Sequence, residues 1–351
     1  MATSVLVTGG AGFIGHNFIN YLLTKHRNHL IVSLDRAPDA RRRLMASYRP
    51  KNSTSRVVDV DGDIANRELV LSLLAQFAPS AIYHFAAESH VDRSIDGPYS
   101  FMENNCMGTF RLLQCAHKYV EQHPPLGFTF INVSTDEVYG STTERKVKMF
   151  TELDPLSPSN PYAASKAAGE MACISFYKTY KFPVIVTRCC NNYGPFQMPE
   201  KLIPLTISNA IQGLPLPVYG SGKQEREWIH VDDHSRALLR LRQHGKDGQV
   251  YNISSRFGVR NVDLVKNIKQ LVGSQSELKH VQDRPGHDLK YAISPSKLEA
   301  IGWEAATELN DGLTQTVDWY LANQDWVSQI EAGREFTRER VGLHPELEAN
   351  G

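Results

Sequence analysis

Two pairs of side chains in this sequence could do chemistry together. Tyr162 and Lys166 stand four residues apart, and Asp136 and Glu137 are adjacent in a Ser-Thr-Asp-Glu-Val-Tyr-Gly segment. Residues four apart share one face of a helix, so a helix over 161–180 would point Tyr162 and Lys166 together. The Lys ammonium would lower the pKa of the phenol. A phenolate formed in this way could take the proton of an alcohol while its hydride leaves.

The acid pair indicates a second chemical step. Hydride transfer needs only the Tyr and the Lys, so Asp136 and Glu137 suggest that something else also happens to the substrate. Thr135 would hydrogen-bond the reacting hydroxyl. Two carboxyls in a closed site resist ionising together, which could keep one of them an acid near neutrality. Each pair alone also fits a non-catalytic interpretation. Tyr162 and Lys166 could belong to a helix with a lysine on its surface, and Asp136 and Glu137 could be an acidic loop after a strand. A cofactor motif upstream favours the catalytic one.

That motif is a glycine-rich turn near the amino terminus. It follows an apolar β run and leads into an apolar-periodic stretch over 13–23, the strand–turn–helix context that a dinucleotide fingerprint requires. The glycines let the backbone approach a pyrophosphate, whose charge the helix amino terminus meets. The cofactor contacts predicted here are Gly9, Gly12, Phe13, Ile14 and Gly15.

An acidic residue ends the second predicted strand and selects the cofactor. Asp35 should accept hydrogen bonds from both adenosine ribose hydroxyls and repel a 2′-phosphate, so we expect NAD and not NADP. Arg36 and the run 41–43 follow at once and could hold a phosphate, although a solvated charge run is the favoured interpretation. Further expected cofactor contacts follow the third and fourth strands: Asp63, Ile64, Ala86 and Ala87.

Alternating strand and helix signals predict an α/β fold with a doubly wound parallel Rossmann sheet and a smaller mixed substrate-binding domain. Further strands are expected at 57–60, 81–86, 128–133, 184–187 and 250–254, with a helix at 231–244. The predicted NAD-binding domain is 1–188 with a return segment at about 225–255. The predicted nucleotide-sugar domain is 189–224 and 256–335, followed by a tail at 336–351.

Composition limits the function classes. The 351 residues contain 38 Lys plus Arg and 38 Asp plus Glu, so no net field would attract nucleic acid or an anionic membrane. No apolar run approaches the roughly 18 residues of a membrane span, and the early strand leaves no room for a signal peptide. Five cysteines without paired spacing and thirteen scattered histidines predict a cytoplasmic protein with reduced thiols and no metal.

Several segments together resemble a known family. They include the glycine turn, Ala86-Ala-Glu-Ser-His-Val-Asp-Arg-Ser94, Ser134-Thr-Asp-Glu-Val-Tyr-Gly140, Asn191-Asn-Tyr-Gly-Pro195 and Arg284-Pro-Gly-His-Asp288. The chain resembles an extended short-chain dehydrogenase/reductase, and within that group the nucleoside-diphosphate-sugar 4,6-dehydratases. The resemblance implies that Tyr162 takes the sugar 4-hydroxyl proton as NAD takes the C4 hydride. Glu137 would then remove the C5 proton, and Asp136 would protonate the departing 6-hydroxyl.

The resemblance also implies where the substrate binds. It assigns phosphate contact to Asn191, places Lys201 near the nucleotide, and gives Arg226 and Arg284 to the diphosphate, a task suited to planar guanidinium forks. His287 is expected to be structural more than catalytic. The full set of predicted substrate contacts is Ser89, Asn191, Glu200, Lys201, Leu202, Arg226, Asn261, Arg284, His287 and Tyr291.

Three functions stay open on the sequence alone. The first is a dehydratase of dTDP-glucose, or of UDP-glucose, since one methyl group separates the two bases. The second is a nucleotide-sugar epimerase or decarboxylase, which would normally lack the acid pair. The third is an NAD-binding scaffold, which would have lost the Tyr or the Lys. A homodimer is also expected, through apolar faces of helices at about 97–120 and 161–180.

Overall fold

The computed structural model of the protein describes residues 3–26, 28–51, 53–123, 127–145, 148–284 and 286–332. Its centre is a seven-stranded sheet in the order β3-β2-β1-β4-β5-β6-β10, in which all neighbouring strands are parallel. The strands are β1 (Thr3–Thr8), β2 (His29–Asp35), β3 (Val57–Asp61), β4 (Ala81–His84), β5 (Thr129–Thr135), β6 (Val184–Cys189) and β10 (Val250–Ile253). The predicted doubly wound Rossmann sheet is confirmed.

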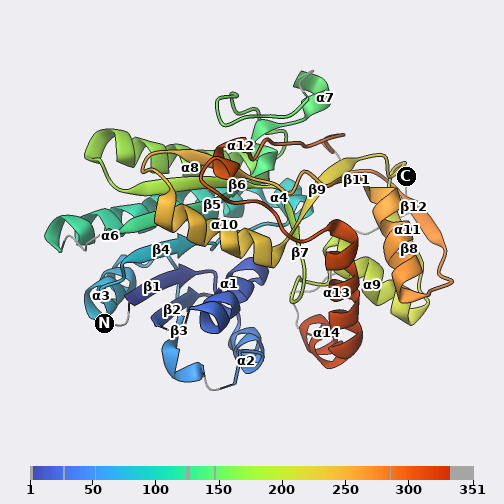
Figure 1. Ribbon diagram of the computed structural model, residues 1–351, viewed down its shortest axis with the longest axis horizontal. Coiled ribbons are helices and arrows are strands. Elements are labelled where there is room, and N and C mark those ends of the chain that lie inside the picture. The colour runs from blue at the N-terminus through green and yellow to red at the C-terminus, as the bar shows by residue number, and fades with distance from the viewer. Residues whose placement is uncertain are drawn as a thin grey trace.

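The sheet is buried on both faces because the strand side chains alternate between two cores. In β1, Val5 and Val7 belong to one core and Leu6 to the other. The first core is covered by α1 (Phe13–Lys25) and α10 (Val231–His244), and the second by α3 (Arg67–Phe77), α6 (Thr109–Gln122) and α8 (Pro161–Tyr180). Figure 1 shows these two helix layers on either side of the sheet. Short helices α2 (Asp39–Ser47), α4 (Val91–Asp96), α7 (Thr142–Arg145) and α12 (Ser296–Glu299) lie in the connections, as do the single turns η1 (Thr54–Arg56) and η3 (Asp136–Tyr139).

The remaining elements form what we call the second lobe, at the right of the sheet in Figure 1. It contains a three-stranded sheet, β11-β9-β7, and a parallel pair, β12-β8. Its core includes Trp228, Leu264, Tyr320 and Trp326. Its elements are β7 (Asn191–Tyr193), β8 (Leu216–Tyr219), β9 (Glu225–His230), β11 (Gly258–Arg260), β12 (Leu278–Val281), α9 (Leu202–Gln212), α11 (Asn261–Val272), α13 (Leu309–Ala322) and α14 (Gln324–Glu331).

Two details differ from the sequence predictions. The helix expected at about 97–120 is three consecutive segments, α5 (Pro98–Phe101), the π-helix η2 (Met102–Gly108) and α6. The return segment at 225–255 rejoins the parallel sheet only through α10 and β10, because β9 pairs with β7 and β11. The division into domains stays a prediction, and the predicted tail at 336–351 lies outside the described residues.

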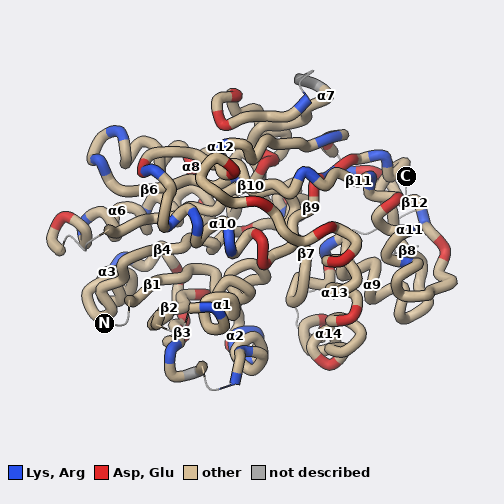
Figure 2. The backbone as a smooth tube through the Cα atoms, in the orientation of Figure 1, with Lys and Arg blue, Asp and Glu red and all other residues tan. Residues whose placement is uncertain are grey.

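Charge is spread evenly over the molecule. Figure 2 shows acidic and basic residues interspersed along both the sheet and the second lobe. Within the described ranges, no helix is both long enough and apolar enough to cross a membrane. The five cysteines are all free thiols. A cytoplasmic location stays a prediction.

Candidate active site

A cavity of about 560 Å³ opens at the carboxyl ends of the parallel strands. Every predicted cofactor residue lines it: Gly9, Gly12, Phe13, Ile14, Gly15, Asp35, Asp63, Ile64, Ala86, Ala87, Tyr162 and Lys166. The predicted catalytic residues Thr135, Asp136 and Glu137 line it as well. The structure therefore brings the glycine turn and both reactive pairs to one site, at the sheet edge where ligands of this fold bind.

The glycine turn is set by close backbone contacts. Gly9 has φ +74°, and a Cβ there would lie 2.7 Å from the Ala86 nitrogen. A Cβ on Gly15 would lie 2.2 Å from the Gly9 carbonyl oxygen. Gly12 comes directly before α1, where a Cβ would meet only that same carbonyl oxygen within 4 Å. The turn thus leaves open space at a helix amino terminus, which suits the pyrophosphate of a dinucleotide.

The adenosine end of the cavity is ordered by carboxylates. Asp35 Oδ2 accepts from the Ala11 nitrogen at 2.8 Å, and its Oδ1 accepts from the Ala37 nitrogen at 2.7 Å. Arg36 is 48% exposed, as expected of a solvated charge, and its guanidinium pairs with Asp63 at 3.1 Å and Glu88 at 2.9 Å on the cavity wall. This pairing balances the Arg36 charge with two carboxylates, which weakens the alternative in which the residue holds a phosphate.

The arginines of the run at 41–43 differ in their exposure and in their distance from the cavity. Arg43 is 80% exposed and pairs with Asp39. Arg42 pairs with Asp61 at 2.7 Å and with Asp39 at 3.4 Å. Both sit on α2 and do not line the cavity, whereas Arg41 of the same run does. Arg42 is only 15% exposed, so the expectation of a solvated run holds for Arg43 and not for Arg42.

The acid pair lies where β5 ends and η3 begins, and its members differ in environment. Asp136 is 2% exposed, and burial, with the charges of Glu137 and Glu227, raises its pKa well above the usual value. Glu137 is only partly buried, and its Oε2 accepts a hydrogen bond from Asn160 Nδ2 at 3.2 Å. The burial that raises the pKa of Asp136 favours its acid form, while Glu137 is presented to the cavity.

Tyr162 and Lys166 face the cavity from the first turns of α8. Asn160 caps this helix by accepting from the Ala163 nitrogen at 2.9 Å. Lys166 is 6% exposed and donates to the Val133 carbonyl at 2.8 Å, and burial lowers its pKa. This hydrogen bond fixes the Lys166 side chain against β5, the strand that leads into the acid pair.

The expected lowering of the Tyr162 pKa is not found in the protein alone. Burial raises that pKa well above its usual value, and the charge of Glu137 raises it further, while a hydrogen bond with Thr135 lowers it. The physical reason is that Tyr162 is fully buried and that the neighbouring carboxylates, Glu137 and Asp136, disfavour a second negative charge on the phenol. An additional positive charge, such as that of an oxidised nicotinamide, is needed for a phenolate to form.

The second lobe supplies only part of the predicted substrate set to the cavity. Asn191, Glu200 and Lys201 line it, together with Ser89 from the sheet side. Lys201 Nζ donates to the Ser89 carbonyl at 3.0 Å, and burial lowers the pKa of Lys201. Leu202 begins α9 immediately after these residues but does not line the cavity.

Three other predicted substrate contacts, Arg226, Tyr291 and Arg284, interact with protein groups outside the cavity lining. Arg226 is 4% exposed, donates to the Glu225 and Asp288 carbonyls, and lies 4.2 Å from the ring centre of Tyr291. Arg284 pairs with Asp92. None of these side chains lines the cavity, so their substrate roles stay predictions.

Two more predicted substrate contacts, His287 and Asn261, also lie outside the cavity lining. His287 Nδ1 lies 2.6 Å from Asp283 Oδ1, and burial, aided by the charge of Arg284, lowers the His287 pKa to about 4. This contact fits the expectation of a structural histidine. Asn261 begins α11, and its buried Oδ1 has no hydrogen-bond partner among the described residues.

Asn160 is a functional candidate that the sequence reasoning missed. It contacts Glu137 and caps the helix that carries Tyr162, so it orients both reactive groups. The signal was present, because an Asn followed by Pro161 is a common helix start. Its contact with Glu137 has no counterpart in the local sequence pattern.

Known proteins match this chain along almost its whole length. The GDP-mannose 4,6 dehydratase family profile matches residues 6–316. A dTDP-glucose 4,6-dehydratase of Xanthomonas campestris is 43% identical, over 96% of this chain and 98% of that protein. The dTDP-glucose 4,6-dehydratase 1 of Escherichia coli is 39% identical, over 94% and 96%. A Streptomyces venezuelae dTDP-glucose 4,6-dehydratase, solved with NAD bound, superposes with a TM-score of 0.86 at 40% identity, covering 93% of this chain and 100% of that one. The chain therefore belongs to the extended short-chain dehydrogenase/reductase family of nucleotide-sugar 4,6-dehydratases.

Proposed function

We propose that this protein is an NAD-dependent hydro-lyase that converts dTDP-glucose to its 4-keto-6-deoxy product. The observation that carries this proposal is the buried Asp136 beside Glu137, in one cavity with Tyr162 and Lys166. Burial raises the pKa of Asp136 well above its usual value, which supports an acid role. The near full-length similarity to dTDP-glucose 4,6-dehydratases supports the same substrate.

The residues present fit NAD. The open glycine turn before α1 suits the pyrophosphate, and the Asp35 carboxylate on the cavity wall suits the adenosine ribose. When bound, NAD supplies a hydride acceptor for sugar C4 and later a hydride donor for C6. Two solved relatives, from Streptomyces venezuelae and Bacillus anthracis, have NAD bound.

In the first step, Tyr162 takes the proton of the sugar 4-hydroxyl while the C4 hydride leaves. Thr135, which hydrogen-bonds Tyr162, orients that hydroxyl. Lys166, fixed by its bond to the Val133 carbonyl, stabilises the phenolate by its charge. The resulting 4-ketone makes the neighbouring C5 proton acidic.

In the second step, Glu137 removes the C5 proton and Asp136 protonates the departing 6-hydroxyl. The electron pair of the C5–H bond forms the C5–C6 double bond as the C6–O bond breaks, and water leaves. Asp136 suits the acid role because burial holds its proton near neutral pH. Asn160 orients Glu137 for the base role.

We assign the nucleoside diphosphate to the second-lobe side of the cavity. Asn191, Glu200 and Lys201 already line it, beside Ser89. We assign further substrate contacts to residues that do not line the cavity: Leu202, Arg226, Asn261, Arg284, His287 and Tyr291. The arginines among them would meet the diphosphate charge.

An epimerase is the competing activity. A UDP-glucose 4-epimerase of Thermotoga maritima superposes with a TM-score of 0.80 at 26% identity, covering 92% of this chain and 100% of that one. Both reactions begin with oxidation at C4, for which Tyr162 and Lys166 suffice. The buried acid pair of Asp136 and Glu137 has no task in an epimerase, which is why we favour the dehydratase.

The test is to incubate the purified protein and NAD with dTDP-glucose and, separately, with UDP-glucose. Product is followed by the absorbance that a 4-keto sugar develops in alkali and by mass spectrometry. We expect loss of one water without net accumulation of NADH, faster with dTDP-glucose. A product of unchanged mass would favour the epimerase and remove Asp136 and Glu137 from these roles.

We also propose a homodimer through α5, η2, α6 and α8. Of the eight large hydrophobic side chains that are exposed among the described residues, five lie on these segments: Tyr99, Met102, Met107, Met171 and Tyr180. Such clustering marks a protein interface.

Met171→Lys should raise the dimer dissociation constant about tenfold, measured by analytical ultracentrifugation. Leu153→Lys is the control, since Leu153 is 96% exposed but lies elsewhere. Equal behaviour of both variants would contradict this interface.

A further inference from the structure

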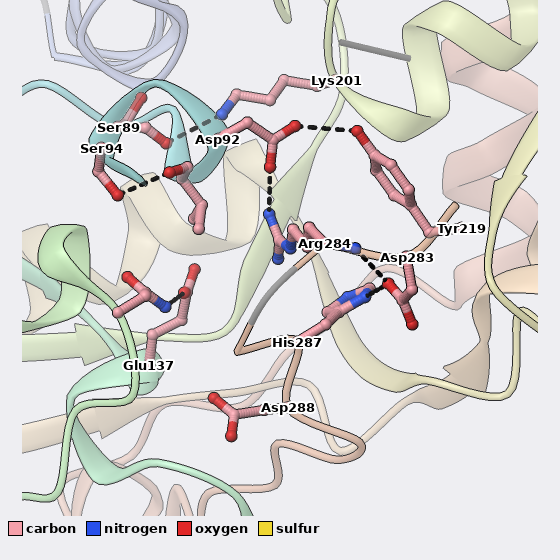
Figure 3. Close-up of polar contacts among 12 residues, drawn as sticks. Ser89, Asp92, Ser94, Glu137, Lys201, Tyr219, Asp283, Arg284, His287 and Asp288 are labelled. Carbon is pink, nitrogen blue, oxygen red and sulfur yellow. Dashed lines mark hydrogen bonds and ion pairs between the residues drawn. The ribbon is translucent and has the colours of Figure 1, made fainter. Parts of the chain in front are cut away.

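Three short contacts join the segment after β4 to the second lobe. Lys201 Nζ donates to the Ser89 carbonyl at 3.0 Å, Tyr219 Oη donates to Asp92 Oδ2 at 2.9 Å, and Arg284 Nη1 donates to Asp92 Oδ1 at 3.2 Å. Figure 3 shows the last two meeting at a single carboxylate. Asp92 thus holds two separate parts of the second lobe, the end of β8 and the loop that carries Arg284.

Asp92 is charged although it is buried. Its side chain is 9% exposed and that of Arg284 is 22% exposed. Burial alone would raise the pKa of Asp92, but the Arg284 charge and the Tyr219 hydrogen bond outweigh it and hold that pKa below the usual value. A hydrogen bond between two ionised groups out of water is stronger than one between neutral groups.

Arg284 lies between two carboxylates. Burial lowers its pKa, whereas the charge of Glu137 and then that of Asp92 raise it. Figure 3 shows Arg284 reaching toward Asp92 and not toward Glu137. Among the described residues, Asp92 is the side chain that accepts from this guanidinium, and it engages Nη1. A guanidinium has five N–H donors, so most of the fork stays available for another anion.

We propose that Asp92 is a positioning residue, which holds Arg284 toward the nucleoside diphosphate and away from Glu137. The inference rests on the proposed function, in which Arg284 meets the diphosphate. A guanidinium that is already fixed loses less conformational freedom when it binds two phosphate oxygens. Without the Asp92 charge, Arg284 turns to Glu137, and the incoming diphosphate has to displace that contact.

The test uses the full-length protein with NAD and the variants Asp92→Asn, Arg284→Gln and their combination. Asp92→Asn should raise the Kd for dTDP, measured by calorimetry, about tenfold. The KM for dTDP-glucose should rise equally while kcat stays within about threefold, because saturating substrate restores the Arg284 position. Arg284→Gln should raise Kd more, and adding Asp92→Asn to it should change nothing further.

The matched control is Glu299→Gln, which removes a carboxylate from the exposed Arg256–Glu299 pair and should leave Kd and KM unchanged. Tyr219→Phe removes only the hydroxyl that orients Asp92. It should raise Kd a few-fold, and it keeps the proposal testable if Asp92→Asn does not fold. Additive effects of Asp92→Asn and Arg284→Gln, or tighter dTDP binding by Asp92→Asn, would overturn the proposal.

The two proposals fail separately. Coupled effects on dTDP binding in a protein that does not turn over dTDP-glucose would reject the dehydratase and keep the positioning role. Normal turnover with additive effects would do the reverse. A wild-type protein that does not bind dTDP would reject the role of Asp92, since Arg284 would have no diphosphate to meet.

Discussion

The two sides of the cavity are built in different ways. On the cofactor side, backbone contacts set the shape: the Gly15 position leaves no space for a Cβ, and two backbone nitrogens hold the Asp35 carboxylate. On the second-lobe side, side chains hold one another: Arg226 stacks on Tyr291, and Arg284 pairs with Asp92. Packed backbone therefore fixes the first side, whereas pairs of side chains from distant parts of the chain fix the second.

This difference separates the expected effects of mutations. A change on the cofactor side disturbs packed backbone, so it should act on stability and on NAD affinity together. A change on the second-lobe side alters which anion Arg284 pairs with: Asp92, Glu137 or the diphosphate. It should therefore act on KM with little loss of stability. The catalytic pair lies where the two sides meet and should act on kcat.

The largest effect is expected at that meeting point. Glu137→Gln removes the base for C5 and should lower turnover about 10²–10⁴-fold. Oxidation at C4 does not need Glu137, so NADH should accumulate in the variant with dTDP-glucose. Exchange of the C5 proton with deuterated water, followed by NMR, should be lost. Retained exchange would contradict the base role, and Glu299→Gln serves as the control.

A smaller effect is expected from adding one methyl group to the cofactor side. Gly15→Ala places a Cβ 2.2 Å from the Gly9 carbonyl oxygen, so the turn has to shift. We expect a loss of about 1–3 kcal/mol in stability and weaker NAD binding, measured by urea unfolding and by fluorescence titration. Gly97→Ala is the matched control, because its nearest neighbour lies 3.7 Å away. Similar losses in both variants would remove the distinction between the two sides.

A pH effect should also arise on the cofactor side. His84 bridges Thr8 and Thr109 beneath the cavity, and burial, with the Lys166 charge, lowers its pKa from 6.5 to about 3. The unfolded chain therefore binds this proton first. The contribution of neutral His84 to the free energy of unfolding is therefore complete above about pH 6.5 and is lost as the pH drops toward about 3.

Between pH 7 and pH 5, His84 should account for up to about 2 kcal/mol of lost unfolding free energy. His84→Gln should reduce that pH-dependent loss by this amount in urea unfolding. His280→Gln, at an exposed histidine of β12, should leave it unchanged. An unaltered pH dependence in His84→Gln would place the acid sensitivity elsewhere.

Sequence predicted the cofactor side well because its determinants are local. The glycine turn, Asp35 and the helix over 161–180 are each specified by residues close together in the chain, and the structure places them together. The second-lobe side depends on distant partners: Arg284 and Asp92 are 192 positions apart, and Arg226 and Asp288 are 62 apart. No local pattern contains such pairings. The raised pKa of Tyr162 has a related cause, since the burial of this residue depends on the whole fold.

The last strand of the large sheet, β10, is synthesised late, and this affects the nascent chain. β10 pairs with β6 and covers its outer edge, yet it lies some sixty residues later in the sequence. During synthesis, the glycine turn, the acid pair and α8 have already emerged when β6 appears, and β6 then stays an open edge with buried-type side chains until β10 follows. Such an edge invites pairing with other chains. A nascent chain should therefore carry a nearly complete nucleotide pocket and an aggregation-prone border at once, until Ile253 has left the ribosome.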